Sequence, residues 1–388
     1  MSTIRLPTAD GDLERYRLAK ATSFTVEKSV VLPRIAYAAV HVVADPLADN
    51  DPWLEPAIDW DATINYRRFV WGLGLGVAEA LDTAQRGMGL DWHRAQELIR
   101  YTFDAAKDFP DAIVAAGCGT DHLVPGPDVS IDDVIRAYEE QMEFVEGQGG
   151  KLIIMASRAL AACAQSPDDY ATVYGRLLSQ AKEPVILHWL GEMFDPALQG
   201  YWGRHDHDGA MDVCLGIIEE HAQKVDGIKI SLLDKDKEIT MRRRLPPNVK
   251  MYTGDDFNYA ELIQGDEQGY SHALLGIFDA IAPAASAALH ALGNGDTDTF
   301  NDILAPTVRL ARHIFKAPTR FYKTGLVFIA YLNGHQDHFA MIGGQQSARS
   351  LVHLAEIFRL TDKAGLLTDQ DMAVSRMRTV LKIHGVKG

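Results

Sequence analysis

Short apolar runs alternate with longer amphipathic stretches along the chain as far as residue 276. The runs are rich in Val, Ile and Ala, which is typical of strands buried on both faces of a parallel sheet. The candidate strands are 36–43, 77–81, 112–116, 151–155, 184–187, 227–231, 250–252 and 272–276. Helical spacing of apolar residues predicts helices near 63–71, 91–107, 131–148, 170–179, 209–222 and 259–263. Strands and helices in this alternation predict an α/β fold, a closed (β/α)8 TIM barrel.

Segments on either side of the strands complete the expected organisation. Residues 1–30 are predicted to be a polar N-terminal extension, residues 31–284 the barrel, and residues 285–388 a C-terminal helical region. Within that last region, helical periodicity is present at 284–292, 298–315 and 347–364, and the polar segment 334–344 is expected to be a loop. The stretch 44–59 is expected to be a long loop after the first strand.

Charge and cysteine content narrow the classes of partner and compartment. The formal net charge of −15 argues against nucleic acid or an anionic membrane as the main partner, because clustered Lys and Arg bind both. The three cysteines, Cys118, Cys163 and Cys214, are widely spaced and predict neither a disulfide framework nor a zinc site. Residues 1–12 carry no apolar leader segment, so a cytoplasmic protein is expected.

A lysine inside an otherwise apolar strand is the most informative feature of the sequence. Lys229 lies in Gly227-Ile228-Lys229-Ile230-Ser231. Burial disfavours the ammonium form, lowers the pKa and makes the neutral amine available as a nucleophile toward a carbonyl. Catalytic groups of (β/α)8 barrels gather at the C-terminal ends of the strands, where this lysine is expected. A lysine that reaches solvent or pairs with a carboxylate is the plain alternative.

Seven segments in sequence order resemble the dihydrodipicolinate synthase and N-acetylneuraminate lyase family of class I aldolase barrels. They are Ile58 to Ala62, Gly87 to Asp91, Ile113 to Gly119, Pro184 to Trp189, Gly227 to Lys229, Tyr252 to Asp256, and Gly269 to Pro283. The third of these resembles the family's third strand with its small-residue turn, and the fifth resembles its Schiff-base strand. The chain is therefore identified as a divergent member of this family.

The resemblance implies a lyase or aldolase in which Lys229 forms a Schiff base with a 2-oxo acid or a sugar-derived carbonyl compound. It implies no cofactor and no metal, a keto acid or aldehyde as small-molecule partner, and a homodimer or homotetramer. Thr83 corresponds to a hydroxyl of the family's proton relay, and His188 stands where the family has a tyrosine. The expected substrate-binding residues are Arg86, Gly117, Asp255, Tyr252 and Ser271.

Departures from the family pattern leave alternatives open. The missing tyrosine fits a non-catalytic keto-acid-binding barrel, unless Tyr37 or Tyr252 reaches the lysine. A metal-dependent isomerase or hydrolase is a second alternative, with ligands drawn from His188, His205, His207 and Asp255. The segment 204–208 is expected to lie in a long loop, and the basic run 242–244 is expected to be a surface turn.

Overall fold

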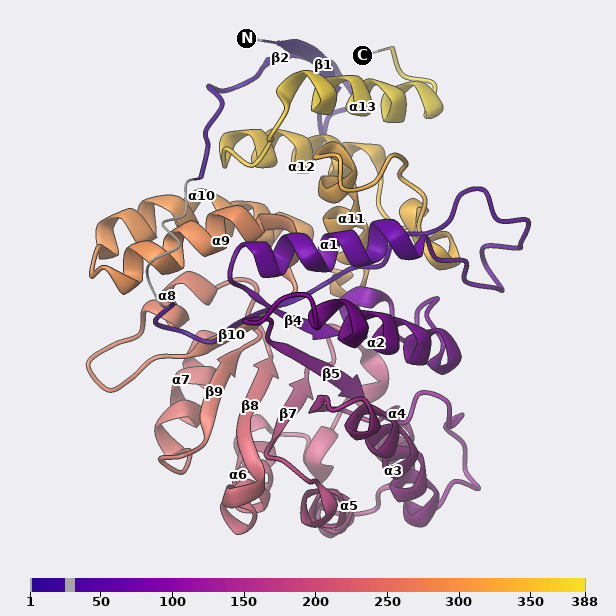
Figure 1. Cartoon of the computed structure of the whole chain (residues 1–388), viewed down its shortest axis with the longest axis vertical. Helices are drawn as coiled ribbons and strands as arrows, with labels where there is room; N and C mark the ends of the chain where they lie inside the picture. The colour runs from indigo at the N-terminus through magenta and orange to yellow at the C-terminus, as the bar shows by residue number, and fades with distance from the viewer. Residues whose placement is uncertain (1, 25–31, 388) are drawn as a thin grey trace.

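Eight parallel strands close into a barrel in the computed structural model, which describes residues 2–24 and 32–387 (Figure 1). The strands are β3 (Ala36–Ala39), β4 (Gly76–Glu79), β5 (Val114–Cys118), β6 (Lys151–Met155), β7 (Val185–Leu190), β8 (Val225–Ser231), β9 (Lys250–Thr253) and β10 (His272–Leu275). Each pairs with its sequence neighbour, and β10 pairs with β3 to complete the ring. The predicted TIM barrel and each of its strands are confirmed.

Helices surround the barrel and follow the strands in the expected alternation. They are α1 (Trp60–Gly72), α2 (Trp92–Ala106), α3 (Ile131–Gly147), α4 (Arg158–Cys163), α5 (Pro167–Gln180), α6 (His207–Glu220), α7 (Lys235–Arg244) and α8 (Tyr259–Gln264). The helices predicted from apolar spacing are confirmed, with ends displaced by a few residues. The prediction missed α4 and α7, because α4 is only six residues long and α7 is strongly polar.

Two polar segments differ from the prediction. The basic run 242–244 is not a surface turn: it forms the last turn of α7, where positive side chains favour the negative end of the helix dipole. Part of the segment 204–208 is helical as well, because Asp206 caps α6 by accepting a hydrogen bond from the Gly209 N–H, and α6 begins at His207. The polar residues that cap and begin a helix have the same composition as a loop, so the sequence alone does not separate the two.

The C-terminal region packs as a helical layer against one side of the barrel (Figure 1). It contains α9 (Ile277–Gly293), α10 (Thr297–Ile314), α11 (Lys323–Leu332), α12 (Leu351–Lys363) and α13 (Gln370–Ile383). Every residue of α11 is buried; the helix is largely apolar after its first two residues, Lys323 and Thr324. The expected boundary between residues 284 and 285 falls inside α9. The division of the chain into a barrel and a separate helical region stays a prediction.

The N-terminal segment forms a small sheet that the sequence did not reveal. Strands β1 (Thr3–Pro7) and β2 (Leu13–Arg17) pair antiparallel across a turn at Asp10 and Gly11, and β1 contacts α12 and α13. Ile4, Leu6 and Pro7 are the buried residues of β1, and this pattern is too short to predict a strand.

The barrel interior is filled toward the N-terminal ends of the strands. The rings of Tyr37 and Tyr252 lie 6.2 Å apart there, and their space depends on two glycines. A Cβ on Gly76 would lie 2.8 Å from the Tyr37 ring, and one on Gly227 would lie 2.6 Å from the Tyr252 ring. This end of the barrel is therefore packed, and open space remains at the C-terminal ends of the strands.

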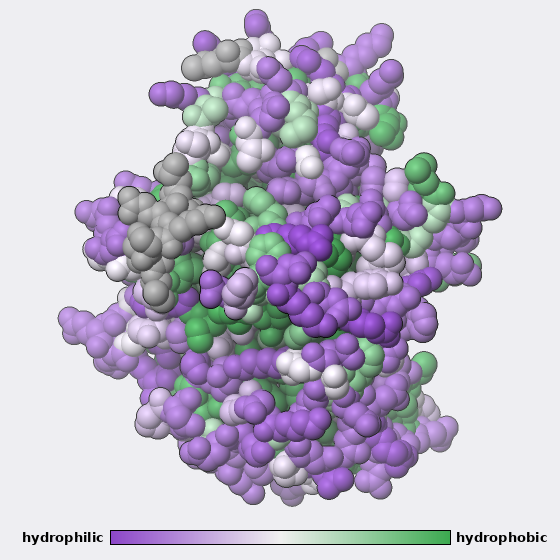
Figure 2. Space-filling view, in the orientation of Figure 1, coloured by the Kyte–Doolittle hydropathy of each residue, from purple (hydrophilic) through white to green (hydrophobic). Residues whose placement is uncertain are grey.

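Hydrophilic residues cover most of the face in Figure 2, as expected for a chain of net charge −15. Among the described residues, every helix is too short or too polar to cross a membrane. The segment after β3 is largely irregular, as predicted, and exposes Leu47, Trp53 and Leu54.

Candidate active site

Lys229 lies on the inner face of β8, near the C-terminal end of the strand. It pairs in register with His188 on β7, and only 7% of its surface is exposed. Ile228 and Ile230, which flank it in sequence, face outward and pack under the surrounding helices. The strand pattern thus directs the lysine into the barrel, as its apolar surroundings in the sequence suggest.

A small chamber surrounds the lysine at the mouth of the barrel. Its polar side chains come from the ends of four strands (β4, β7, β8 and β9) and from the C-terminal region: Asp82, Thr83, His188, Lys229, Ser231, Asp256 and Tyr322. Three of these, Lys229, His188 and Thr83, are the residues expected to be catalytic. The structure brings them together around one space.

Two glycines at the ends of β9 and β10 create the space in which these side chains meet. A Cβ on Gly254 would lie 2.7 Å from the Lys229 Cε and 2.6 Å from the Ile230 carbonyl oxygen. A Cβ on Gly276 would lie 3.2 Å from the Tyr322 ring and 3.4 Å from the Thr83 Oγ1. Any side chain at position 254 would displace the lysine, so its position depends on a glycine there.

Burial lowers the pKa of Lys229 to about 8, against the opposing attraction of the Asp256 and Asp82 carboxylates. Burial also raises the pKa of Asp256, and the hydrogen bond that its Oδ1 accepts from the Ile277 N–H, at 2.8 Å, opposes that rise. The pKa values of Lys229 and Asp256 therefore lie closer together than those of the two groups in water. Transfer of a proton from the Lys229 ammonium to Asp256 therefore requires less free energy than it would in water.

Tyr322 enters the chamber from the residue before α11. Its hydroxyl lies 2.8 Å from the Thr83 Oγ1, its ring stacks on Phe315 with centroids 4.3 Å apart, and Phe194 meets it edge-on. Burial holds the pKa of the phenol well above its usual value, so the hydroxyl keeps its proton. The sequence prediction missed this tyrosine because it searched the strand ends, and no spacing links position 322 to the barrel.

Lys323, the next residue, carries a second buried ammonium to the mouth of the barrel. Only 1% of it is exposed, and its Nζ lies 2.9 Å from the Asp82 Oδ1 and 3.0 Å from the Arg320 carbonyl oxygen. Within residues 2–24 and 32–387, the second carboxylate oxygen of Asp82 has no hydrogen-bond partner. That oxygen is a free acceptor at the chamber.

His188 is held as a neutral ring. Its Nε2 lies 3.2 Å from the Ser231 Oγ, and burial together with the nearby Lys229 charge lowers its pKa well below the usual value. A neutral imidazole can orient a hydroxyl or a substrate oxygen, but it does not supply a proton as an imidazolium at neutral pH.

Three of the expected substrate-binding residues are engaged away from the chamber. The Tyr252 hydroxyl donates to Asp226 at 2.8 Å, at the start of β8 and the opposite end of the barrel. Ser271 precedes β10 at that same end and donates to Glu238 at 2.6 Å. Asp255 accepts from the backbone N–H groups of residues 257 and 258. Tyr37, considered as a substitute relay, packs beside Tyr252.

Arg86 and Gly117 lie near an outer pocket that adjoins the chamber. The Arg86 guanidinium binds both carboxylate oxygens of Asp121, at 2.9 and 2.7 Å, and donates to the Gly117 and Ala80 carbonyl oxygens and to Gln141. Its donors are thus used within the protein. Gly117 packs against Leu81, where a Cβ would lie 2.7 Å from a leucine methyl.

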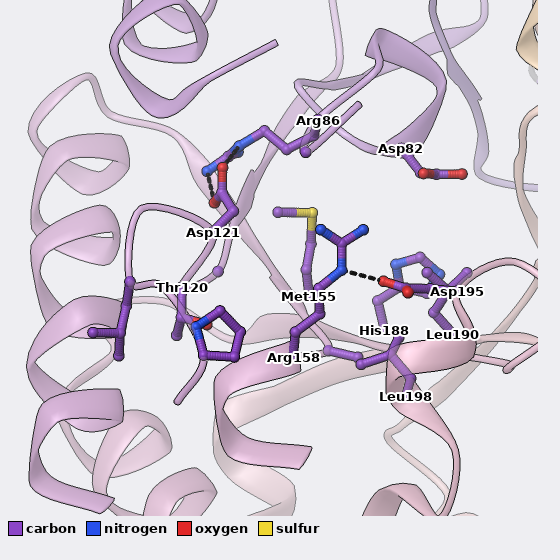
Figure 3. A pocket seen from close by; sticks show the side chains of 15 residues that line it. Asp82, Arg86, Thr120, Asp121, Met155, Arg158, His188, Leu190, Asp195 and Leu198 are labelled. Atoms are coloured by element: carbon purple, nitrogen blue, oxygen red, sulfur yellow. Dashed lines mark hydrogen bonds and ion pairs between the residues drawn. The ribbon is translucent and has the colours of Figure 1, made fainter. Parts of the chain in front are cut away.

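The outer pocket lies over the C-terminal ends of β4 to β7 and shares Asp82, His188 and Leu190 with the chamber (Figure 3). Figure 3 shows Arg158 extending into it, with an ion pair from its Nε to Asp195 at 2.5 Å. The sequence prediction missed Arg158, because the helix that it begins was not predicted.

The histidines of the metal hypothesis are not brought together. His188 lies in the chamber, whereas His205 and His207 line a separate hollow beside α6. In the part of the chain that the structure describes, no group of three or more His, Cys, Asp or Glu side chains is placed to share one ion. His335, from the predicted loop, packs against Tyr66 and Phe69 of α1.

The strands and this chamber define a closed (β/α)8 barrel with a buried lysine at its C-terminal mouth. A family model described as "Protein of unknown function (DUF993)" matches residues 4–386, and the chain belongs to this family. Among curated proteins, no sequence matches the chain.

Solved structures of the dihydrodipicolinate synthase family are similar in fold. YagE from Escherichia coli K12, a member of that family solved in complex with pyruvate, has a TM-score of 0.61 at 13% identity, covering 92% of this chain and 100% of its own. Dihydrodipicolinate synthase from Bacillus anthracis has a TM-score of 0.60 at 15% identity, covering 84% of this chain and 98% of its own. Dihydrodipicolinate synthase from Aquifex aeolicus has a TM-score of 0.59 at 12% identity, covering 91% of this chain and 98% of its own. The resemblance found in the sequence is thus confirmed as a likeness of fold.

Proposed function

We propose that the protein is a Schiff-base-forming lyase or aldolase that acts on a 2-oxo acid or a sugar-derived carbonyl compound. The observation that carries the proposal is the buried Lys229 with its lowered pKa, in a chamber that also holds a hydroxyl pair. Its position at the C-terminal end of a barrel strand supports the same conclusion.

Lys229 acts as the nucleophile. Its neutral amine adds to the carbonyl carbon, the carbonyl oxygen takes up protons and leaves as one water, and an iminium remains on the substrate. The iminium accepts the electron pair of an adjacent carbon–carbon or carbon–hydrogen bond, which allows that bond to break, or to form in the reverse direction. Hydrolysis by one water releases the product and restores the amine.

Two groups handle the protons of these steps. The Thr83 and Tyr322 hydroxyls, 2.8 Å apart, can pass a proton between the reacting oxygen and the chamber. Asp256, whose pKa is raised by burial, accepts the proton that Lys229 loses before it attacks. His188 and Ser231 form a hydrogen bond with each other, and together they hold the substrate oxygen.

Borohydride trapping tests the proposal. Wild-type protein incubated with a panel of 2-oxo acids and aldehydes and then reduced should gain the mass of the reduced adduct on Lys229, as located by peptide mass spectrometry. Lys229→Ala should gain none, whereas Lys235→Ala removes an exposed lysine on α7 and should trap as the wild type does. An unmodified Lys229 across the panel, with turnover retained in Lys229→Ala, would refute the Schiff base.

A carbonyl compound that binds without forming an imine would favour the non-catalytic alternative. Calorimetry beside the trapping experiment separates the two, because binding without an adduct is visible only in the heat signal.

A further inference from the structure

The outer pocket gives a substrate room to extend from Lys229. The pocket meets the chamber at Asp82, His188 and Leu190, so a molecule whose carbonyl carbon reaches the lysine continues past these side chains. The inference below rests on the proposed function, because it assigns the far end of the same substrate.

Arg158 offers unused hydrogen-bond donors to this pocket. An arginine has five N–H donors, and only the Nε–H of Arg158 is engaged, by Asp195 at 2.5 Å. No described residue accepts a hydrogen bond from either terminal nitrogen. Figure 3 shows the guanidinium head directed between Met155 and His188, with these nitrogens toward the pocket.

The backbone opposite Arg158 is shaped to admit its head. A Cβ on Gly87 would lie 3.0 Å from the Arg158 Nη1, and Gly87 has a φ of +69°, which L side chains rarely adopt. The glycine therefore permits this loop conformation and leaves room for the guanidinium beside it. Arg158 is thus held between Asp195 and Gly87 with one edge free.

Arg86, the other arginine of the pocket, has no unused donors to offer a ligand. Arg86 is 5% exposed, and its guanidinium donates to Asp121, Gln141 and two carbonyl oxygens. Binding a ligand there would require breaking these bonds. The free positive edge of the pocket is therefore that of Arg158.

Apolar side chains line the path beside this edge. Met155, Leu190 and Leu198 form part of the wall. The Arg158 side chain is 41% exposed, so this wall shields its donors on one side while the other side is open to water.

We propose that Arg158 binds a second anionic group, a carboxylate or a phosphate, at the far end of the substrate whose carbonyl reacts with Lys229. The substrate class is then a 2-oxo diacid or a 2-oxo acid with a terminal phosphate, rather than a short monoacid. Two parallel N–H donors match the oxygens of either group.

Matched acids of equal chain length test the assignment. Half-saturating concentrations for borohydride trapping are measured with 2-oxopentanoate, 2-oxoglutarate and 2-oxo-4-phosphonobutanoate, which differ at the far end. The wild type should prefer one of the two doubly acidic compounds to 2-oxopentanoate by about fivefold, the usual upper effect of an ion pair that water partly screens. Whichever is preferred identifies the carboxylate or the phosphate.

Variants separate binding from structure. Arg158→Gln should remove the preference and leave 2-oxopentanoate within about twofold, and Arg158→Lys should restore part of it, because one charge remains. Arg136→Gln, an exposed arginine on α3 that pairs with Asp133, should leave the preference unchanged. No preference in the wild type, or equal losses for all three acids in Arg158→Gln, would overturn the assignment.

Acids that lack the 2-oxo group, and so cannot form an imine, distinguish this assignment from the Schiff base. Calorimetry compares glutarate with pentanoate on the wild type and on Arg158→Gln. Selective glutarate binding that Arg158→Gln abolishes supports the anion site even if no acid is trapped on Lys229, an outcome that would refute only the Schiff base. Trapping without any selectivity in either experiment refutes only the anion site.

Discussion

The dependence of Lys229 on a glycine at position 254 gives a sharp test of the site geometry. In Gly254→Ala the new methyl group would lie 2.7 Å from the Lys229 Cε and 2.6 Å from the Ile230 carbonyl oxygen. Both distances are shorter than any relaxed contact of a carbon atom, so the lysine, the strand end or both must move. Overpacking of this kind destabilises a protein by about 1–3 kcal/mol. A displacement of about 1 Å at a reacting atom lowers the rate by about 100-fold.

Two measurements on the purified variant check the reasoning. Urea denaturation should show a lower free energy of unfolding, and borohydride trapping at saturating carbonyl substrate should proceed about 100-fold more slowly. The matched control is Gly216→Ala in the middle of α6, where no atom lies within 4 Å of a new Cβ. It should raise the free energy of unfolding by about 0.5–1 kcal/mol and leave trapping unchanged. Wild-type stability and trapping in Gly254→Ala would show that the lysine does not lie where the structure puts it.

Three further outcomes follow from the same geometry. Tyr322→Phe keeps the stacked ring but removes the hydroxyl from Thr83, so turnover should fall by about 100-fold or more while stability falls by only about 1 kcal/mol; equal turnover would exclude Tyr322 from proton transfer. The trapping rate with Lys229 should rise about tenfold per pH unit up to its pKa of about 8 and level off above it, because only the neutral amine attacks; a rise that continues to pH 10 would indicate an unperturbed lysine. The Glu79 carboxylate binds two nitrogens of the buried Arg67 guanidinium, each at 2.9 Å, so Glu79→Gln leaves that charge unpaired. Urea denaturation should then show a free energy of unfolding lower by about 3–5 kcal/mol. A loss below about 1 kcal/mol would contradict the pairing.

The sequence predicted those parts of the site that strand direction controls. Lys229, His188 and Thr83 each follow or end an apolar run, and the C-terminal ends of parallel strands meet at one mouth, so the three were expected together and are found together. Strand direction also explains Ser271, since a residue that precedes a strand lies at the other end of the barrel. A role of Ser271 in substrate binding stays a prediction.

Side-chain direction and long-range contacts were beyond the sequence. Tyr252 points into the barrel as expected, but a long side chain can lean toward either end, and Asp226 draws its hydroxyl toward the N-terminal end. Tyr322 reaches the chamber from a helical layer, and nothing in helical periodicity tells which residue of such a layer meets the barrel mouth. Arg86 was chosen for its charge, which Asp121 neutralises within the protein.

The C-terminal region contributes a charged partner to the carboxylates around Lys229. Asp82 and Asp256 both favour the Lys229 ammonium and therefore oppose the effect of burial on its pKa. Lys323 pairs with Asp82 at 2.9 Å, and a carboxylate that already holds one ammonium attracts a second one less strongly. The pairing thus leaves Asp256 as the main counter-charge of Lys229, and Asp256 itself has a raised pKa. The barrel strands position the amine, and Lys323 of the C-terminal region engages one of the two carboxylates that act on it.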